Sequence, residues 1–345
     1  MAQRKSEGKL LNIVPPPRLS LARLPTPFHA LDRLSEQLGG PRIWVKRDDL
    51  TDCGVSGNKI RKLEFTLARV LEQNCDTIIT CGGVQSNHCR ATALLGARLG
   101  LRVHLILRGD NVASAESAGP DGNLFLDYLA GAEVSIYEKR DYQRRLPELF
   151  AHWSQYYKAR DKRPYEIPTG ASDATGVWGY AHCVPELITD FSVAGIKPRA
   201  IIHATGSGGT QAGLIAGAIL HELDGDIIGM AVCDNAQYFH DKVSADIRQW
   251  QDLYNIDLPS RELPIHVDER FIGPGYAQAT DDVFAMIRRV ASLEGLLLDP
   301  VYTGKAFNGM IEKIRLGEFS GHSDIVFVHT GGVFGLLAQA SNFKF

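Results

Sequence analysis

The chain has 345 residues, of which 44% are hydrophobic and 22% are charged, and its formal net charge is -3. The length predicts two domains or one large α/β unit, and the near-neutral charge gives no sign of a nucleic-acid or membrane-surface partner. No apolar run approaches the length of a membrane span, and residues 1–9 are too polar for a secretory signal, so we expect a cytoplasmic protein.

Six cysteines are scattered through the chain without CxxC spacing. Free thiols in a reducing compartment fit this distribution better than disulfides do. The pairs His88-Cys89 and His182-Cys183 are adjacent residues, which is a poor spacing for chelating one metal ion from a helix. We therefore expect no metal site.

The first 75 residues contain two predicted helices and one predicted strand. A helix is predicted over 28–38, because this stretch follows Thr26-Pro27 and ends at Gly39-Gly40. The apolar run 43–46 predicts a strand. Apolar residues among charges from Ile60 to Gln73 predict an amphipathic helix.

Lys59 would stand at the N-terminus of this second helix, just after Ser56 and Asn58, whose side chains are typical of helix caps. The partial positive charge of a helix N-terminus disfavours an ammonium group and lowers the pKa of a lysine. A lysine of lowered pKa can form a Schiff base, although a lone lysine on a helix is more often simply solvated. The rest of the chain decides between these interpretations.

Strands and helices alternate from Asp76 to Tyr137. Such alternation predicts parallel strand pairing with right-handed crossover connections. We therefore predict a small, open α/β domain over residues 64–165. Its expected elements are strands at 77–80, 103–107 and 133–137, helices at 89–99 and 123–129, and an exposed, charged helix within 139–163.

The second half of the chain continues the alternation and predicts a larger α/β domain. We expect the first 63 residues to pack onto it, so that residues 1–63 and 166–345 form one discontinuous domain. The fold class is then α/β, with two open, twisted, mainly parallel sheets. The expected elements after residue 165 are helices at 176–189, 211–222, 281–294, 305–315 and 333–340, and strands at 200–204, 227–232, 296–298 and 325–328.

A glycine-rich turn, residues 205–210, lies between a predicted strand and a predicted helix. Its backbone N–H groups would point outward at the positive end of that helix, which predicts a cradle for a phosphate group. A dinucleotide fingerprint starting at Gly206 would need glycine at position 211, where the chain has Gln211, so a single phosphate fits better. A tight turn without a ligand is the alternative interpretation.

Ser86, Asn87 and His88 occupy the N-terminus of the helix predicted over 89–99. Unpaired N–H groups at such a position suit a carboxylate, and the Ser86 hydroxyl is also able to move a proton. The alternative is an ordinary Ser/Asn cap without a ligand.

Two further turns, 299–305 and 329–332, also follow predicted strands, where ligands gather in open α/β sheets. Tyr302, in the first of them, and Tyr276 are candidates for hydroxyl groups near a reacting centre, although a tyrosine more often lines the rim of a site. A lysine of lowered pKa, a phosphate cradle and a carboxylate cradle together match what pyridoxal phosphate chemistry of amino acids needs.

The stretches Ser56–Glu64 and Gly83–Arg90 resemble the D-cysteine desulfhydrase and 1-aminocyclopropane-1-carboxylate (ACC) deaminase family. Three later segments, 205–213, 299–305 and 329–332, match the same family in the same order, so the resemblance covers nearly the whole chain. It implies a pyridoxal phosphate enzyme of fold type II, like the tryptophan synthase β-subunit. That class has a large cofactor domain and a smaller mobile domain, and it usually forms a homodimer.

The resemblance also implies roles for individual residues. Lys59 would form the Schiff base with the cofactor, Lys62 would help to hold its phosphate, and Asn87 would contact its phenolic oxygen. Ser86, Tyr276 and Tyr302 join Lys59 as catalytic candidates. The other roles implied are phosphate binding by the backbone of Gly206, Ser207, Gly208, Gly209 and Thr210, cofactor contact by Thr303, and substrate binding by Ser86, Asn87, His88 and Thr330.

Two positions divide the family. ACC deaminases resemble one another in the patterns PVYEGK and HLGG, with a glutamate facing the pyridine nitrogen of the cofactor, whereas this chain has Thr303 and Thr330, the desulfhydrase pattern. A carboxylate keeps that nitrogen protonated and makes the ring a strong electron sink, which opening of a cyclopropane ring needs. A neutral threonine suffices when a good leaving group such as a thiolate stands on Cβ.

We therefore expect β-elimination of D-cysteine to pyruvate, hydrogen sulfide and ammonia, with Lys59 or Ser86 removing the Cα proton. The alternatives are ACC deaminase, a lyase for another β-substituted amino acid such as β-chloro-D-alanine or L-cysteate, and a cofactor-free or nucleotide-binding regulatory protein. Ser56, Ile60 and Asp173 depart from residues frequent in the family, which leaves the substrate more open than the cofactor.

Overall fold

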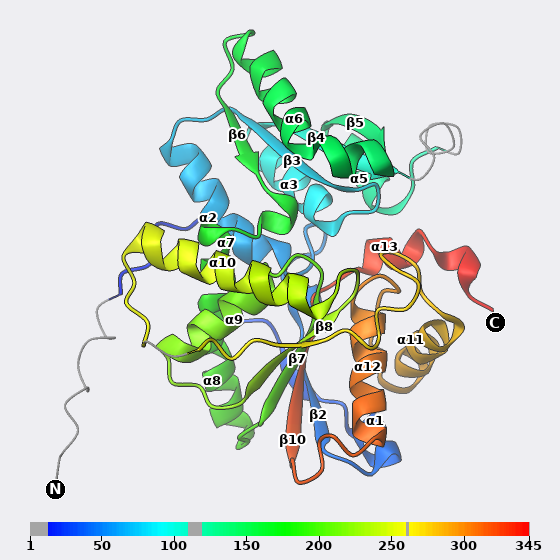
Figure 1. The fold of residues 1–345 in the computed structure, drawn as a ribbon. Coiled ribbons are helices and arrows are strands. Elements are labelled where there is room, and N and C mark those ends of the chain that lie inside the picture. The colour runs from blue at the N-terminus through cyan, green and yellow to red at the C-terminus, as the bar shows by residue number, and fades with distance from the viewer. Residues whose placement is uncertain (1–12, 110–118, 260–261, 345) are drawn as a thin grey trace, which may run out of the picture.

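The computed structural model describes residues 13–109, 119–259 and 262–344. Their strands form two sheets, in which every strand pair is parallel except the first pair of the larger sheet (Figure 1). This arrangement confirms the predicted α/β class with two mainly parallel sheets. The larger sheet has the strand order β1 (Phe28–Ala30), β2 (Arg42–Lys46), β10 (Asp324–Val328), β7 (Ala200–Thr205), β8 (Asp226–Ala231) and β9 (His266–Asp268), and the smaller has the order β5 (Glu133–Glu138), β4 (Arg102–Gly109), β3 (Thr77–Gly83) and β6 (Pro164–Ile167).

Helices cover both faces of the six-stranded sheet (Figure 1). Successive side chains of a strand point to opposite faces, so Trp44 of β2 packs into one core cluster while Ile43 and Val45 pack into the other. The first face carries α7 (Ala174–Ala181), α8 (Cys183–Ala194), α9 (Gly209–Leu220) and α10 (Ala236–Tyr254), and the second carries α1 (Asp32–Leu38), α11 (Asp281–Glu294) and α12 (Thr303–Arg315).

The four-stranded sheet is also covered on both faces. Ile78 and Ile79, which are neighbours on β3, pack into two different clusters for the same reason. The first face carries α2 (Lys59–Glu72), α3 (Asn87–Arg98) and α5 (Gly122–Leu129), and the second carries α6 (Lys139–Lys158). Four short helices complete the described chain: η2 (Asp48–Leu50), η3 (Thr169–Ala171), α13 (Val333–Leu337) and η4 (Ala340–Asn342).

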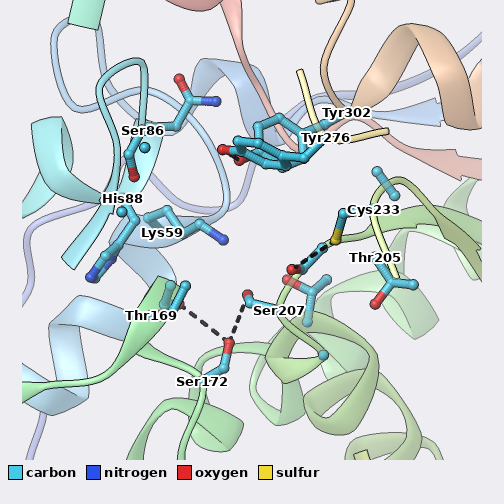
Figure 2. A pocket seen from close by; sticks show the side chains of 18 of the residues that line it. Lys59, Ser86, His88, Thr169, Ser172, Thr205, Ser207, Cys233, Tyr276 and Tyr302 are labelled. Carbon is cyan, nitrogen blue, oxygen red and sulfur yellow. Dashed lines mark hydrogen bonds between the residues drawn. The ribbon is translucent and has the colours of Figure 1, made fainter. Parts of the chain in front are cut away.

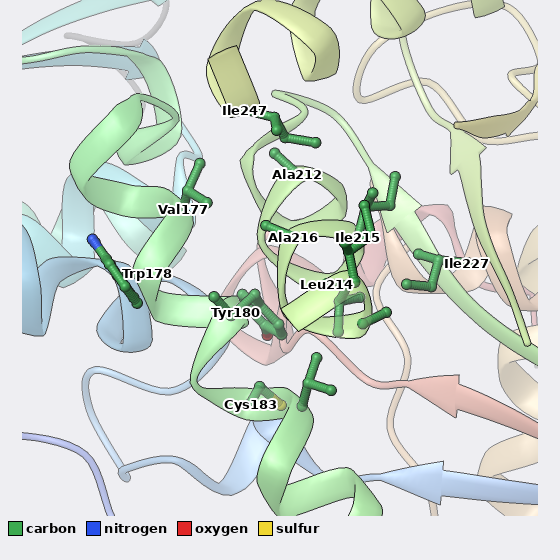
Figure 3. Packing of buried hydrophobic residues seen from close by; sticks show 14 of the residues in the cluster. Val177, Trp178, Tyr180, Cys183, Ala212, Leu214, Ile215, Ala216, Ile227 and Ile247 are labelled. Carbon is green, nitrogen blue, oxygen red and sulfur yellow. The ribbon is translucent and has the colours of Figure 1, made fainter. Parts of the chain in front are cut away.

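Glycines on two helices allow the close packing that fixes the start of α2. A Cβ at Gly213 of α9 would lie 2.5 Å from the Cβ of Tyr180 of α7, so these helices pack backbone to backbone (Figure 3). A Cβ at Gly179 of α7 would lie 2.7 Å from the backbone of Arg61 in α2. The first turn of α2, where Lys59 stands, is therefore held by a stack of three helices.

Some predicted elements are wrong. The predicted helix over 28–38 is a strand in its first part, because residues 28–30 pair with β2 as β1, and α1 begins only at Asp32. The strand predicted at 296–298 does not form, and the segment packs two leucines into the core instead. The helix predicted over 176–189 is divided into α7 and α8, and the sequence expectations omitted β6, α10 and β9.

The carboxyl ends of β3 and β4 face those of β7, β8 and β10 across one cavity. Although β1 and β2 come first in the chain, they belong to the larger sheet through the pairing of β2 with β10. The division of the chain into domains at residues 63/64 and 165/166 stays a prediction. In the part of the chain that the structure describes, no helix is long and apolar enough to cross a membrane.

Candidate active site

A cavity of about 400 Å³ lies between the two sheets, in the size range of small-molecule sites (Figure 2). It is formed at the carboxyl ends of parallel strands, where ligands bind in open α/β folds. Of the residues predicted from the sequence, the lining includes Lys59, Ser86, Asn87, His88, Gly206, Ser207, Gly208, Thr210, Tyr276, Tyr302 and Thr330.

Lys59 is the first residue of α2, and its amine points into the cavity (Figure 2). A Cβ at Gly170 would lie 3.4 Å from the Lys59 Nζ atom, so the amine is closely enclosed. Burial lowers the pKa of Lys59 to about 8, which is the predicted direction, but the cause is desolvation and not the helix terminus from which the shift was predicted. The sequence predicted that the Asn58 side chain caps this helix. It does not, and instead donates to Thr210 Oγ1 at 3.0 Å. That bond ties the start of α2 to the glycine-rich turn.

The glycine-rich turn joins β7 to α9 and presents its backbone to the cavity. Gly208 has a φ of 82°, a left-handed conformation that favours glycine. A Cβ at Gly206 would lie 3.1 Å from the Tyr302 ring, and one at Gly209 would lie 2.6 Å from Ser172 Oγ. The first N–H groups of a helix have no intrahelical acceptor, and here the Gly209 N–H donates to Ser172 Oγ at 3.2 Å. The turn therefore offers N–H groups of Ser207, Gly208 and Thr210 to an anion.

Lys62 lies behind this turn and does not line the cavity. Its amine is fully buried and donates to Ser172 Oγ at 3.1 Å, and within the described ranges no carboxylate lies within ion-pair distance of it. Burial, followed by the neighbouring Lys59 charge, holds the pKa of Lys62 well below its usual value. A phosphate in the glycine-rich turn would supply the missing negative charge.

Ser86 and His88 have separate roles at the start of α3. Ser86 is the N-cap and accepts the Cys89 N–H at 3.2 Å through its hydroxyl oxygen. His88 Nε2 lies 2.7 Å from Thr80 Oγ1, and the single Thr80 hydroxyl proton is donated to Ile167 O at 2.8 Å, so Nε2 must be the donor. Burial holds the pKa of His88 well below its usual value, so Nδ1 of the neutral ring is an acceptor. A carboxylate at this helix terminus would therefore bind backbone N–H groups and not the His88 ring.

The orientation of the Asn87 amide is fixed from behind. Arg90 Nη1 donates to Asn123 Oδ1 at 3.0 Å, which leaves Asn123 Nδ2 to donate to Asn87 Oδ1 at 3.1 Å. Because the oxygen of Asn87 is directed to Asn123, its NH₂ group is free to donate into the cavity. A donor at this position fits the predicted contact with a phenolic oxygen.

Tyr276 and Tyr302 form a hydroxyl pair on the opposite wall (Figure 2). Their Oη atoms are 2.6 Å apart, and their rings meet edge to face. Burial raises the pKa of both phenols, so both hydroxyl groups stay protonated at neutral pH. The pair can therefore supply a proton to a group in the cavity.

Thr330 lines the cavity, but Thr303 does not. The Thr303 hydroxyl donates to Asp299 Oδ1 at 2.7 Å and accepts the Asp299 N–H at 2.8 Å, and the side chain is fully buried. The predicted contact of Thr303 with the cofactor is therefore not supported by its position. Thr303 instead fixes the buried Asp299 carboxylate, against which Gly332 packs so closely that a Cβ there would lie 2.5 Å from Asp299 Oδ1.

The sequence analysis missed several residues of the lining. Arg108 lies at the carboxyl end of β4, Cys233 and Asp234 come just after β8, and Ser172 comes just after η3. The signal that was available is the position of the first three at the ends of parallel strands. Among the described residues, no cluster of three or more His, Cys, Asp or Glu side chains could hold a metal ion.

The donor set fits pyridoxal phosphate. Bare N–H groups at the start of α9 and the buried amine of Lys62 suit its phosphate. The Lys59 amine, of lowered pKa, enters the same cavity and suits its aldehyde. The Asn87 NH₂ group suits its phenolic oxygen.

Comparisons with known proteins agree with this chemistry. The sequence profile of the family described as "Pyridoxal-phosphate dependent enzyme" matches residues 19–331. A putative 1-aminocyclopropane-1-carboxylate deaminase of Thermotoga maritima is 41% identical over 94% of this chain and 98% of its own length. The mitochondrial bifunctional D-cysteine desulfhydrase/1-aminocyclopropane-1-carboxylate deaminase of Arabidopsis thaliana is 39% identical over 94% of this chain and 80% of its own length. The crystal structure of an ACC deaminase homologue matches with a TM-score of 0.85 at 34% identity and covers 95% of each chain.

Proposed function

Since the chain belongs to the family of pyridoxal-phosphate dependent enzymes, we propose that it is a lyase that eliminates the β-substituent of D-cysteine and releases pyruvate, hydrogen sulfide and ammonia. The observation that carries the proposal is the cavity itself. A lysine amine of lowered pKa, a glycine-rich turn and the N-terminus of α3 all open into it. The name of the Arabidopsis relative, which includes D-cysteine desulfhydrase, supports this substrate.

Pyridoxal phosphate, when bound, draws electrons from the Cα atom of an amino acid and makes its Cα–H bond acidic. The Lys59 amine would hold the aldehyde end of the cofactor, and Asn87 would donate to its phenolic oxygen. The backbone at 206–210 and the Lys62 amine would hold its phosphate. Lys62 and Asn87 are already positioned by hydrogen bonds within the protein, so these two groups need little reorganisation on binding.

The Cα proton needs a base, and Lys59 meets the requirement best. With a pKa of about 8, its amine exchanges protons near neutral pH, as an acid–base group must. The Ser86 hydroxyl also faces the cavity, but it already accepts the Cys89 N–H, which makes its oxygen a weaker base. The protonated Tyr276–Tyr302 pair is suited to donating a proton to the departing sulfur.

The substrate carboxylate would bind at the N-terminus of α3. Backbone N–H groups and the positive end of the helix favour an anion there. Because the neutral His88 ring presents an acceptor, recognition would fall to the backbone and to the Ser86 hydroxyl.

ACC deaminase is the second candidate, because both relatives described above carry that activity in their names. We favour elimination from cysteine because Thr330, which lines the cavity, is uncharged, and Thr303, which does not line it, brings no carboxylate to the cavity either. Neither side chain would keep the pyridine nitrogen of the cofactor protonated. Loss of a thiolate needs less electron withdrawal than opening of a cyclopropane ring.

A panel of D- and L-amino acids and ACC, assayed for 2-oxo acid and for sulfide, tests the proposal. We expect pyruvate and sulfide in equal amounts from D-cysteine, and neither from a Lys59→Ala variant. The substrate assignment fails if purified protein loaded with pyridoxal phosphate produces 2-oxobutyrate from ACC but no sulfide from D-cysteine. Turnover of L-cysteate or β-chloro-D-alanine alone would also contradict it.

The expected assembly rests on the resemblance, and the expected location rests on the sequence composition. We propose a cytoplasmic homodimer that acts on a small amino acid and whose smaller domain, residues 64–165, moves relative to the rest. Sedimentation velocity of the purified protein measures its mass, and a stable monomer at micromolar concentration would contradict the dimer.

A further inference from the structure

Arg108 is a cation of the cavity to which the proposed reaction gives no role. It stands at the carboxyl end of β4 and lines the cavity. Its register partner on the neighbouring strand β3 is Gly83, three residues before Ser86, and the Val84 N–H donates to Arg108 O at 3.1 Å. Arg108 therefore lies on the same rim of the small sheet as the start of α3, where the substrate carboxylate is proposed to bind.

The Arg108 guanidinium lies against two tyrosine rings. Its Cζ atom is 4.7 Å from the centre of the Tyr276 ring and 5.7 Å from the centre of the Tyr142 ring. Among residues 13–109, 119–259 and 262–344, no oxygen accepts a hydrogen bond from this group and no carboxylate pairs with it. A guanidinium carries five N–H donors in a planar fork that matches an anion. Arg108 thus keeps its donors for a ligand.

Two other cations, one in the cavity lining and one on the same strand, have carboxylate partners. Lys242 contacts the Asp246 carboxylate and donates to the Ser172 backbone oxygen at 3.0 Å. Arg102, at the opposite end of the same strand as Arg108, pairs with Glu133. Arg108 therefore differs from both in bringing a positive charge to the cavity without a counter-charge from the described protein.

Tyr276 connects Arg108 to the reacting part of the cavity. A Cβ at Gly83 would lie 3.4 Å from Tyr276 Cε1, and the Tyr276 hydroxyl bonds that of Tyr302 at 2.6 Å. In an α-amino acid the β-substituent is only two bonds from Cα. With its carboxylate at the start of α3, a substrate can therefore extend this substituent along the Tyr276 ring toward Arg108.

We propose that Arg108 binds the β-substituent of the substrate as an anion, and that the enzyme selects α-amino acids whose β-substituent is an anion or leaves as one. The inference rests on the proposed function and adds the group that recognises the leaving atom. The chemical class includes thiolate, sulfonate and carboxylate substituents. For a thiol, a neighbouring guanidinium favours the thiolate.

In the proposed elimination, Arg108 acts when the carbon–sulfur bond breaks. The Cα–H bond breaks and its proton passes to the Lys59 amine, while its electron pair forms the Cα=Cβ double bond. The Cβ–S bond breaks with both electrons on sulfur. A thiol keeps its proton, whereas a thiolate takes one from the Tyr276–Tyr302 pair, so in either form the sulfur leaves as hydrosulfide and accepts hydrogen bonds from Arg108. The released 2-aminoacrylate tautomerises and takes up water to give pyruvate and ammonia.

Aspartate and asparagine separate this role from the alternatives, because they have nearly the same size and only aspartate carries an anionic β-substituent. Isothermal titration calorimetry on the holoenzyme measures the binding of both enantiomers of each. We expect aspartate to bind about tenfold or more tightly than asparagine for the better-bound enantiomer, as for a charge-assisted contact. Arg108→Met should reduce this ratio to about one, and Arg108→Lys should retain part of it. Arg102→Met, on the same strand, should leave the ratio unchanged.

The same measurement can overturn the inference. If Arg108→Met weakens aspartate and asparagine equally, Arg108 binds the α-carboxylate or only supports the cavity. If the wild-type enzyme does not distinguish the two ligands, the anion site does not exist. If the aspartate preference depends on Arg108 but D-cysteine gives no sulfide, the proposed lyase activity fails while the anion site stands.

Discussion

Two buried lysines offer a test of the proposed phosphate site, because one has carboxylate partners and the other has none among the described residues. The side chains of Lys46 and Lys62 are both fully buried. The Lys46 amine contacts the carboxylates of Glu186 at 2.5 Å and Asp190 at 2.6 Å. Although burial lowers the pKa of Lys46, these carboxylates raise it overall. Lys62 has only the Ser172 hydroxyl, and its pKa is held well below the usual value.

The two lysines should respond to the same substitution with opposite signs. Lys62→Met removes a buried amine that pairs with no carboxylate of the described residues, so we expect a gain of about 1–4 kcal/mol in the free energy of unfolding of the cofactor-free protein. Lys46→Met leaves two carboxylates without their common cation, so we expect a loss of about 3–5 kcal/mol. Both substitutions replace lysine by an unbranched side chain that is one heavy atom shorter, so the contribution of packing is small and similar in the two variants.

Cofactor binding should change in the opposite direction at Lys62. A hydrogen bond to a charged group contributes about 1.5–3 kcal/mol, so loss of the Lys62 amine should weaken pyridoxal phosphate by about 10- to 100-fold. Lys46 lies in the ion pairs behind α2 and should affect the dissociation constant much less. Lys62→Met is thus expected to stabilise the cofactor-free protein and to weaken the holoenzyme.

Urea unfolding of the cofactor-free variants and titration with pyridoxal phosphate, followed by its absorbance, measure the two effects. Both variants are compared with the wild-type protein under the same conditions. The reasoning is refuted if Lys62→Met destabilises the cofactor-free protein as much as Lys46→Met does. Unchanged affinity for pyridoxal phosphate in Lys62→Met would show that the Lys62 amine does not contact the phosphate.

Two further predictions concern the reacting groups. Only the uncharged amine attacks an aldehyde, and burial lowers the pKa of Lys59 to about 8, so the rate at which the cofactor-free protein takes up pyridoxal phosphate should rise with pH through a midpoint near 8. Borohydride should then attach the cofactor to Lys59. A pH-independent rate, or labelling of another lysine, would contradict this prediction. Ser86→Ala should lose the helix cap, which contributes about 1 kcal/mol of stability, and most of the affinity for the substrate carboxylate, whereas Ser86→Thr should keep the cap. Thermal unfolding measures the first effect and the KM for D-cysteine measures the second. An unchanged KM in Ser86→Ala would show that Ser86 does not bind the carboxylate.

The local pattern predicted much of the fold because parallel α/β units repeat over short stretches. Each buried strand is a short apolar run bounded by a turn, and each covering helix carries an apolar face. Errors occurred where the tertiary partner decides the conformation. Residues 28–30 form a strand only because β2 offers them an edge to pair with, and residues 296–298 pack into a core without a strand beside them.

The candidate site was predictable where the chemistry resides in one turn. Lys59, the glycine-rich turn and the residues at the start of α3 are each recognisable from a few consecutive residues at the junction of a strand and a helix. Thr303 was misplaced, because its hydroxyl is occupied by Asp299, and no local pattern shows which way it turns. Arg108 was missed for the same reason, because an arginine at a strand end looks like any other until its neighbours are known.

The sequence by itself determined the two parallel sheets, the lysine and the anion-binding turns, because these depend on hydrophobic periodicity and on backbone geometry within a few residues. Only the tertiary structure decided that the turns from both sheets open into one cavity and that burial lowers the pKa of the Lys59 amine. It also decided which cations keep a carboxylate partner and which remain free for a ligand. Desolvation and pairing depend on residues that are far apart in the chain, and folding alone brings them together.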